Sequence, residues 1–141
     1  MKSLILLILT TIFLISCNIE HSPIKYGKDA CNFCKMNIVD NQHAAEIVTK
    51  KGKPFKYDAI ECMVEELKER DEKEITLFLI TDYSAPGKLV DARTATYLIS
   101  ENIPSPMGAN LSGFELSKNA TEFMNKNGGK LYTWTELKGL F

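Results

Sequence analysis

Two thiols and a thioether lie within six residues of one another, in the segment Cys31–Met36. A C-x-x-C pair curves the backbone around one point, which is why it occurs in both metal sites and redox sites. Thiolate and thioether sulfurs are the soft ligands that select Cu(I), whereas a thioether contributes nothing useful to a zinc site. Met36 therefore favours a copper site with Cys31 and Cys34, and the alternative for Met36 is packing in the core.

Two further sulfur residues could complete such a site. Cys62 is expected on a helix, about 160° around the axis from Ile60 at ~100° per residue, so it points away from the apolar stripe. Its position in the first helical turn also favours a thiolate. Met107 lies between Pro106 and Gly108, in a loop that fixes the backbone without requiring an apolar residue. Both are candidate ligands, and the alternatives are a buried small hydrophobe for Cys62 and a loop anchor for Met107.

Redox catalysis and structural zinc use the same residue types. Thioredoxin-like enzymes place C-x-x-C where a strand runs into a helix, whereas a hairpin is expected after Cys34. A structural zinc site needs four ligands, and only Cys62, His21 and His43 remain to complete the pair. His43 is a weaker candidate ligand, because it is expected to face solvent or to cap the edge of a strand. These residues therefore favour copper.

The apolar pattern after this segment predicts one unit of hairpin, helix and strand. Its elements are strands at 43–49 and 55–57, a helix at 59–70 and a strand at 75–81 that is buried on both faces. Apolar residues recur from Ile60 at i, i+3, i+4 and i+7, which indicates an amphipathic helix. Asp58 is the expected N-cap, with Glu61 completing a capping box, and the acidic residues from Glu65 onward form a solvated face.

A similar order follows in the second half of the chain. The expected elements are strands at 88–91 and 94–99, a loop at 101–113 around Met107, a short strand at 113–116, a helix at 117–127 and a strand at 130–133. Ser117 is the expected cap of that helix, and two glycines end it at Gly128. Hairpin, helix and strand thus occur twice, at 43–81 and 94–133. We predict an α+β fold of two such units with antiparallel sheet.

Composition limits the possible partners. The chain has 141 residues, 45% of them hydrophobic and 25% charged, which is typical of a globular protein with a core of its own. Seventeen Lys and Arg against 18 Asp and Glu leave a net charge of -1. There is no basic field to attract phosphate backbones, so nucleic acid is not an expected partner.

The N-terminus has the pattern of a lipoprotein signal peptide. Lys2 precedes an apolar run at Leu4–Ile15, which is too short for a membrane-spanning helix of ~20 residues. The run ends in the sequence L-I-S-C at Cys17, similar to a bacterial lipobox, in which the cysteine becomes the first mature residue and carries acyl chains. We predict a signal peptide over 1–16, a lipidated Cys17 with a tether over 17–30, and a metal-binding domain over 31–141. Cleavage to an ordinary secreted protein is the alternative.

Taken in order along the chain, these motifs resemble those of the NosL family of accessory lipoproteins, copper chaperones associated with nitrous oxide reductase. The resemblance covers nearly the whole chain after the signal peptide. It rests on Cys17, Cys31-x-x-Cys34-x-Met36, Ala44-Ala45, Gly52-Lys53, Asp58-x-x-x-Cys62-Met63, Asp82-Tyr83, Asp91-Ala92, Ser105-Pro106-Met107-Gly108 and Gly128-Gly129-x-x-x-Thr133-Trp134-x-Glu136-Leu137.

This resemblance implies a monomeric, non-enzymatic protein that is anchored in a cell membrane and faces the periplasm. It would bind Cu(I) and pass it to the apo form of nitrous oxide reductase, with an ABC-type maturation system as a further partner. The implied fold is similar to the core of organomercurial lyases. Cys34, Cys62 and Asp58 keep a lyase-like activity as an alternative, which ranks lower because the methionine motifs have no role in that chemistry.

Our hypothesis for the chemistry is transfer by ligand exchange. Cys34 is the expected thiolate anchor, Met36 and Met107 are the neutral ligands, and Cys31 or Cys62 is a third partner. A site with few ligands and one negative charge binds Cu(I) and still releases it through an intermediate shared with an acceptor.

Overall fold

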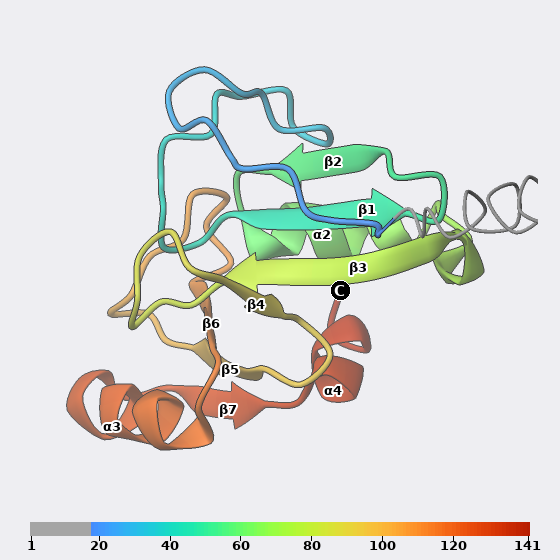
Figure 1. Cartoon of the computed structure of the whole chain (residues 1–141). Helices are drawn as coiled ribbons and strands as arrows, with labels where there is room; N and C mark the ends of the chain where they lie inside the picture. Colours follow the sequence, from blue (N-terminus) through green and yellow to red (C-terminus); the bar gives the residue numbers. More distant parts are fainter. Residues whose placement is uncertain (1–17) are drawn as a thin grey trace, which may run out of the picture.

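The computed structural model describes residues 18–141, which form two antiparallel sheets and the helices that cover them (Figure 1). The predicted signal peptide and Cys17 lie outside the described residues. Within residues 18–141, no helix is long and apolar enough to cross a membrane.

The first sheet holds four strands in the order β2-β1-β3-β4. Their bounds are Ala45–Thr49 for β1, Pro54–Tyr57 for β2, Ile75–Thr81 for β3 and Leu89–Asp91 for β4. Helix α2 (Ile60–Leu67) follows β2, and a short 3-10 helix at Glu72–Glu74 leads into β3. The central strand β1 pairs with both β2 and β3, so Ala45 lies opposite Tyr57 on one side and Ile80 on the other.

The second sheet holds three strands in the order β6-β5-β7. Their bounds are Thr96–Ile99 for β5, Leu111–Phe114 for β6 and Lys130–Tyr132 for β7. Helix α3 (Ser117–Asn127) connects β6 to β7, and α4 (Trp134–Lys138) ends the fold. In Figure 1 the second sheet and α3 lie beneath the first sheet.

The two halves share one topology. In each, a hairpin is followed by a helix and by a third strand that pairs with the first strand of the hairpin, giving β2-β1-β3 and β6-β5-β7. The α+β class with antiparallel sheet is therefore confirmed. Strand β4 is an addition at the edge of the first sheet, where it pairs with β3.

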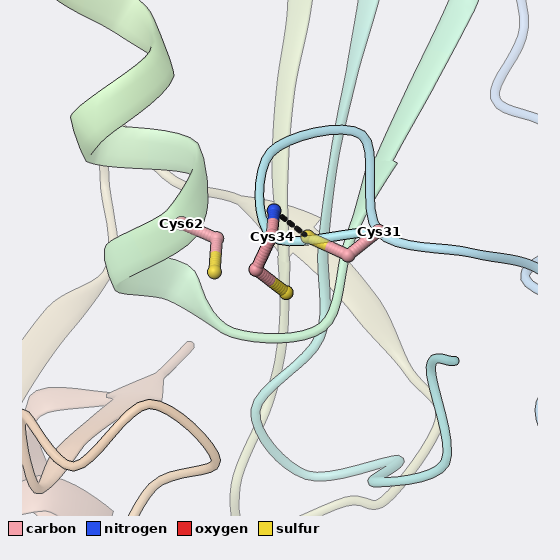
Figure 2. A group of neighbouring side chains, drawn as sticks. All are labelled: Cys31, Cys34 and Cys62. Atoms are coloured by element: carbon pink, nitrogen blue, oxygen red, sulfur yellow. Dashed lines mark hydrogen bonds between the residues drawn. The ribbon is translucent and has the colours of Figure 1, made fainter. Parts of the chain in front are cut away.

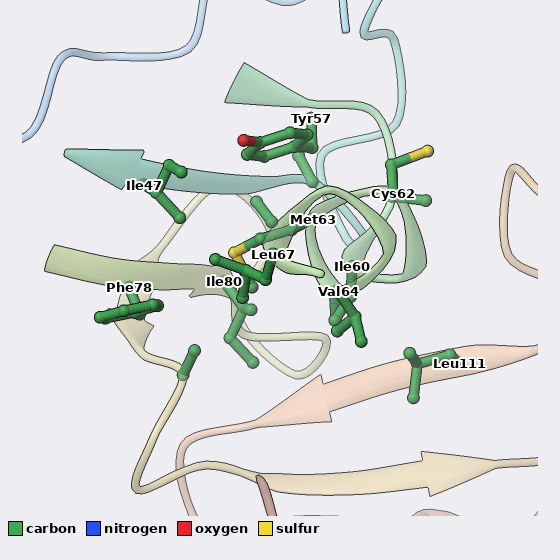
Figure 3. Packing of buried hydrophobic residues seen from close by; sticks show 14 of the residues in the cluster. Ile47, Tyr57, Ile60, Cys62, Met63, Val64, Leu67, Phe78, Ile80 and Leu111 are labelled. Atoms are coloured by element: carbon green, nitrogen blue, oxygen red, sulfur yellow. The ribbon is translucent and has the colours of Figure 1, made fainter. Parts of the chain in front are cut away.

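The main core lies between α2, the first sheet and β6. Figure 3 shows Met63 and Leu67 of α2 on the side of the first sheet, and Ile60 and Val64 on the side of Leu111 in β6. This is the apolar stripe expected from the sequence. A smaller cluster lies under α3, where buried Ala120 and partly buried Phe123 and Met124 pack with Leu98, Ile103 and Phe114.

The ends of both long helices differ from the expected ones. The residue that caps α2 is Ala59, without a side-chain cap, and the helix ends at Leu67 rather than near residue 70. Asp58 is not a cap, because its side chain is turned into the protein and is buried. Likewise Ser117 is the first residue of α3, and Leu116 occupies the cap position. Strand β6 begins at Leu111, inside the segment expected to be a loop.

The segment that precedes Cys31 packs on the domain. The Ser22 amide donates to Oε1 of buried Glu46 at 2.8 Å, and Nζ of Lys56 donates to the Pro23 carbonyl at 2.8 Å. Ile24 and Tyr26 contribute to the main core. In Figure 1 this segment, drawn in blue, crosses in front of β1. The part of the predicted tether from Ser22 to residue 30 therefore belongs to the folded domain, because its apolar residues and its amide find partners there.

Candidate metal centre

Three thiols from two distant segments meet at one point. Cys31 and Cys34 lie on the loop before β1, and Cys62 lies in the first turn of α2. Their sulfur atoms all lie within 4.8 Å of one another. Figure 2 shows the Cys34 side chain between Cys62 on the helix and Cys31 on the loop, with the Cys34 amide hydrogen-bonded to the Cys31 sulfur. A soft metal ion held by all three sulfurs would be in a trigonal thiolate site.

The loop that carries the first two cysteines is closed by backbone hydrogen bonds. The Cys31 amide donates to the Met36 carbonyl at 2.7 Å, and the Lys35 amide donates to the Cys31 carbonyl at 3.0 Å. A bridge between Ala30 and Asn37 closes its base. The turn requires a left-handed backbone at Lys35, whose φ is 67°. This tight turn brings the sulfurs of the C-x-x-C pair together.

Asn32 fastens this loop to α2. Its Nδ2 donates to both carboxylate oxygens of Glu66, at 2.8 and 2.7 Å, and its amide donates to the Lys56 carbonyl at 2.8 Å. Arg70 also pairs with Glu66, and its guanidinium lies 3.8 Å from the centroid of the Phe55 ring. Glu66 is buried. It therefore does not belong to the solvated helix face expected from the sequence.

Removing this connection is expected to weaken metal binding. Glu66→Ala frees Asn32, so the loop no longer holds its two thiols against Cys62. Because residues that orient metal ligands contribute about 10- to 100-fold to affinity, we expect the Cu(I) affinity to fall about tenfold. Competition with a Cu(I) chelator measures the change. Glu69→Ala, at an exposed position in the turn after α2, is the matched control. An unchanged affinity in Glu66→Ala would contradict the role of the Asn32 contact.

The three thiols share one negative charge, which lies on Cys31. The Cys62 thiol donates to the Cys31 sulfur, and the Cys34 amide donates to it at 3.5 Å, so the pKa of Cys31 is lowered to about 5. The pKa of Cys62 is raised because its thiol is the donor in that bond, and burial raises the pKa of Cys34. In the metal-free protein Cys31 is thus the most acidic of the three thiols. The role of Cys34 as the thiolate anchor of bound copper stays a prediction.

This charge distribution is testable in the reduced, metal-free protein. We expect ultraviolet thiolate absorbance to show one group ionising with a pKa of about 5, its thiolate present above that pH and lost below it. Cys62→Ala removes the donor thiol and should raise this pKa. Cys34→Ala should have the smaller effect, because it removes a thiol beside Cys31 but leaves the Cys34 backbone N–H donor and the Cys62 thiol in place. A pKa that is the same in Cys62→Ala and in the unaltered protein would disprove the shared charge.

The two candidate thioethers are exposed near the three thiols. Met36 is 58% exposed and lies on the cysteine loop, while Met107 is 44% exposed and borders a cavity that Cys62 also lines. Neither side chain serves as a core anchor. Their participation as ligands stays a prediction.

The candidate histidines are elsewhere. His43 is buried, not solvent-facing: its Nδ1 lies 2.8 Å from Oδ2 of Asp40 and its Nε2 lies 3.1 Å from Oγ of Ser112. His21 is exposed at a second hollow beside Pro23. Among the described residues, one group of His, Cys, Asp or Glu side chains lies close enough together to hold a metal ion. This group consists of the three cysteines and includes no histidine. A closed zinc site of four ligands therefore lacks its fourth member here.

A cavity of about 320 Å³ adjoins the metal centre. It is lined by Phe33, Glu61, Cys62, Glu65, Met107, Gly108, Ala109 and Phe141. Sequence patterns did not identify Glu61 or Phe141 as part of a site. Glu61 carries the signature of a capping box, but the structure places its carboxylate against the hydroxyl of Ser105.

Comparisons with known proteins find a matching family and a solved structure of similar fold. The NosL family model matches residues 24–139. Among solved structures, the crystal structure of the copper chaperone NosL from Shewanella denitrificans matches with a TM-score of 0.73 and 22% sequence identity. The match covers 84% of this chain and 96% of that chain, and at this identity it shows a common fold. No curated protein matches the chain.

Proposed function

This chain belongs to the NosL family, and on that premise we propose that it is a membrane-anchored Cu(I) chaperone that delivers copper to nitrous oxide reductase. The observation that carries the proposal is the meeting of Cys31, Cys34 and Cys62, whose sulfurs lie within 4.8 Å of one another. Soft sulfur ligands with exposed thioethers nearby suit Cu(I) better than zinc. The family relationship with a copper chaperone supports a carrier rather than an enzyme.

Access to the three sulfurs supports a site that both binds and releases its cargo. Cys34 is partly exposed, whereas Cys31 and Cys62 are each 1% exposed. Copper arriving from solvent would contact Cys34 first and then the Cys31 thiolate. Each further Cu–S bond to a thiol displaces a proton, so the ion is held without a change in its oxidation state. Met36 and Met107 would then act as weak, exchangeable ligands on the way out.

The remaining parts of the proposal concern location and partners. The lipobox supports acylation of Cys17 and a position at a periplasmic membrane surface, with the protein acting as a monomer. Its clients would be the apo-reductase and the associated ABC-type maturation system. Incorporation of labelled palmitate that is lost in Cys17→Ala tests the anchor. The copper content of the reductase from cells lacking this protein tests delivery, and restoration by the unaltered chain alone supports it.

A metal competition tests the copper site directly. The reduced protein should keep Cu(I) against a Cu(I) chelator and should not exchange it for Zn(II) at neutral pH. Oxidation of any two of the three thiols to a disulfide should release the copper, because the bridged sulfurs lose their charge. A thiol count on each sample links the loss to disulfide formation. Zinc preference, or full retention of Cu(I) by the disulfide form, would overturn the proposal.

A further inference from the structure

Residues 18–23 cross one face of the first sheet above a buried glutamate. Ala45 and Ile47 of β1 belong to the main core on the side of α2, so Glu46 between them points to the opposite face. In Figure 1 the blue segment that contains residues 18–23 crosses β1 on the side away from α2. Glu46 is 0% exposed, because this segment lies over its carboxyl group and bonds to it.

The segment over Glu46 supplies it with one hydrogen bond. The Ser22 amide donates to Oε1 at 2.8 Å, whereas Oε2 is buried and has no hydrogen-bond partner among residues 18–141. An ionised carboxylate accepts hydrogen bonds through both oxygens, so burying it with a single donor leaves its charge poorly compensated. A protonated carboxyl group has no charge and loses much less by the same burial. The docked segment therefore suits the protonated form of Glu46.

Three charged or titratable groups face Glu46 from different elements. Lys56 lies opposite it in β2, but its Nζ is paired with Oδ2 of Asp29 at 2.7 Å. Asp29 belongs to the turn after the segment, and its negative charge opposes ionisation of Glu46. His21 belongs to the segment itself and is exposed. On the other side of β1 the neighbour of Glu46 is Leu79 of β3, which carries no charge.

The balance of these influences favours the proton. Burial is the largest of them and raises the pKa of Glu46. The Ser22 hydrogen bond and the nearby His21 and Lys56 oppose it, but the pKa stays raised. An exposed glutamate has a pKa of ~4.3. The contribution of Glu46 to docking is therefore complete below about that pH, and it is lost as the pH rises through the raised pKa.

We infer that residues 18–23 are a pH-sensitive strap, which docks on the first sheet while Glu46 is protonated and leaves it when Glu46 is ionised. The structure shows the docked state. The strap ends at Ile24, which packs against the main core together with Tyr26 and should stay in place. Release breaks no covalent bond of the chain: Glu46 gives one proton to water, and its carboxylate gains the hydration that the strap withholds.

The consequence of release for the reach of the domain rests on the proposed acylation of Cys17. With the strap docked, the first fixed residue after the lipid is Ser22, and with the strap released it is Ile24. This adds two residue steps, or about 7 Å at ~3.6 Å per residue. A rise in pH would thus give the domain more freedom to turn its metal centre toward a partner, and acid would restrain it.

Hydrogen exchange of the Ser22 amide, followed by NMR in the whole, metal-free protein, tests the inference. The protection factor, which corrects for the direct effect of pH on exchange, reports the ratio of docked to released strap. Because each unit of pKa shift changes that ratio tenfold, we expect the protection to fall about tenfold between about pH 4 and about pH 8. The Thr81 amide, which donates to the Ala44 carbonyl at 2.9 Å, should keep its protection, because the sheet stays intact.

Glu46→Gln makes this group permanently neutral and keeps an acceptor for the Ser22 amide. Its Ser22 protection should be independent of pH and, at about pH 8, about tenfold higher than in the unaltered protein. Glu20→Gln is the matched control, because it makes the same change on the exposed strap, and His21→Asn removes the other titratable side chain of the strap. Both should keep the fall within about twofold. Constant protection in the unaltered protein, or a fall that disappears in a control rather than in Glu46→Gln, would overturn the inference.

Carbon-13 titration of the Glu46 carboxyl group in the unaltered protein gives a second measurement. Its midpoint should lie above ~4.3 and coincide with the midpoint of the change in Ser22 protection. An ordinary midpoint would overturn the inference even if Glu46→Gln failed to fold.

Neither copper nor a lipid takes part in these measurements. A Ser22 protection that ignores pH contradicts the strap and leaves the proposed copper site untouched. Failure of the protein to take up Cu(I) contradicts the proposed function and leaves the strap untouched.

Discussion

Replacing Cys34 with serine (Cys34→Ser) is expected to lower the Cu(I) affinity of the reduced protein by about a hundredfold or more. Residues that only orient a metal ligand already contribute about 10- to 100-fold, so loss of a ligand should exceed that range. A hydroxyl is a hard donor that stays protonated and cannot replace a thiolate for a soft ion. Competition with a Cu(I) chelator at fixed pH measures the change. Because Cys34 is partly exposed, its replacement should leave the core intact.

Methionine variants distinguish ligands from packing residues in the same experiment. Met36→Ile and Met107→Ile keep apolar bulk and remove the thioether, so any loss of affinity reports on sulfur. Met124→Ile is the matched control, because Met124 is a methionine of α3 that packs against the second cluster. Cys34→Ser with an affinity within about twofold of the unaltered protein would show that this thiol is not a ligand.

The largest loss of stability is expected for Gly129→Ala. Gly129 has a φ of +104°, and a Cβ atom added there would lie 2.2 Å from the carbonyl oxygen of Ile99 in β5. Because the obstacle is backbone of the central strand of the second sheet, it cannot move aside without disturbing the pairing of β5 with β7. Strain of this kind costs ~1–3 kcal/mol before the steric contact is added, so we expect about 3 kcal/mol or more in the free energy of unfolding.

The adjacent glycine supplies the control. Gly128 also has a positive φ, of +74°, but a Cβ atom added there meets nothing within 4 Å. Gly128→Ala should therefore lose about 1–3 kcal/mol, the backbone strain alone, because its ψ of -171° at this φ lies in a region that is essentially restricted to glycine. Denaturant unfolding of the two variants separates the contributions. Equal losses would mean that the approach of Ile99 has no energetic effect.

The positions of the helices and strands were largely predictable because they depend on local patterns. The apolar spacing from Ile60 predicts α2, and the same helical geometry places Cys62 away from the stripe that Met63 and Leu67 form. The structure agrees: Cys62 is buried, but against the cysteine loop rather than against the sheet. The direction of the Cys62 side chain was predictable because the spacing of residues along the sequence fixes their angles around a helix axis.

Partners that are distant along the chain were not predictable in this way. His43 is buried because Ser112, 69 residues later, offers an oxygen to its ring. Glu61 and Asp58 fit the spacing of a capping box, yet Glu61 pairs with Ser105 across the fold and Asp58 turns inward. Local capping preferences amount to about 1 kcal/mol, which tertiary contacts readily exceed.

The packing of residues 22–30 on the first sheet limits how far the domain can travel from a lipid at Cys17, where we propose acylation. Five residue steps separate Cys17 from Ser22, whose amide is already fixed to Glu46. At no more than ~3.6 Å per residue, the connection spans about 18 Å at most. Such a short connection would keep the domain close to the lipid headgroups and restrict its rotation. A recipient of copper must then come to the bilayer surface, and it meets the carrier in a narrow range of orientations.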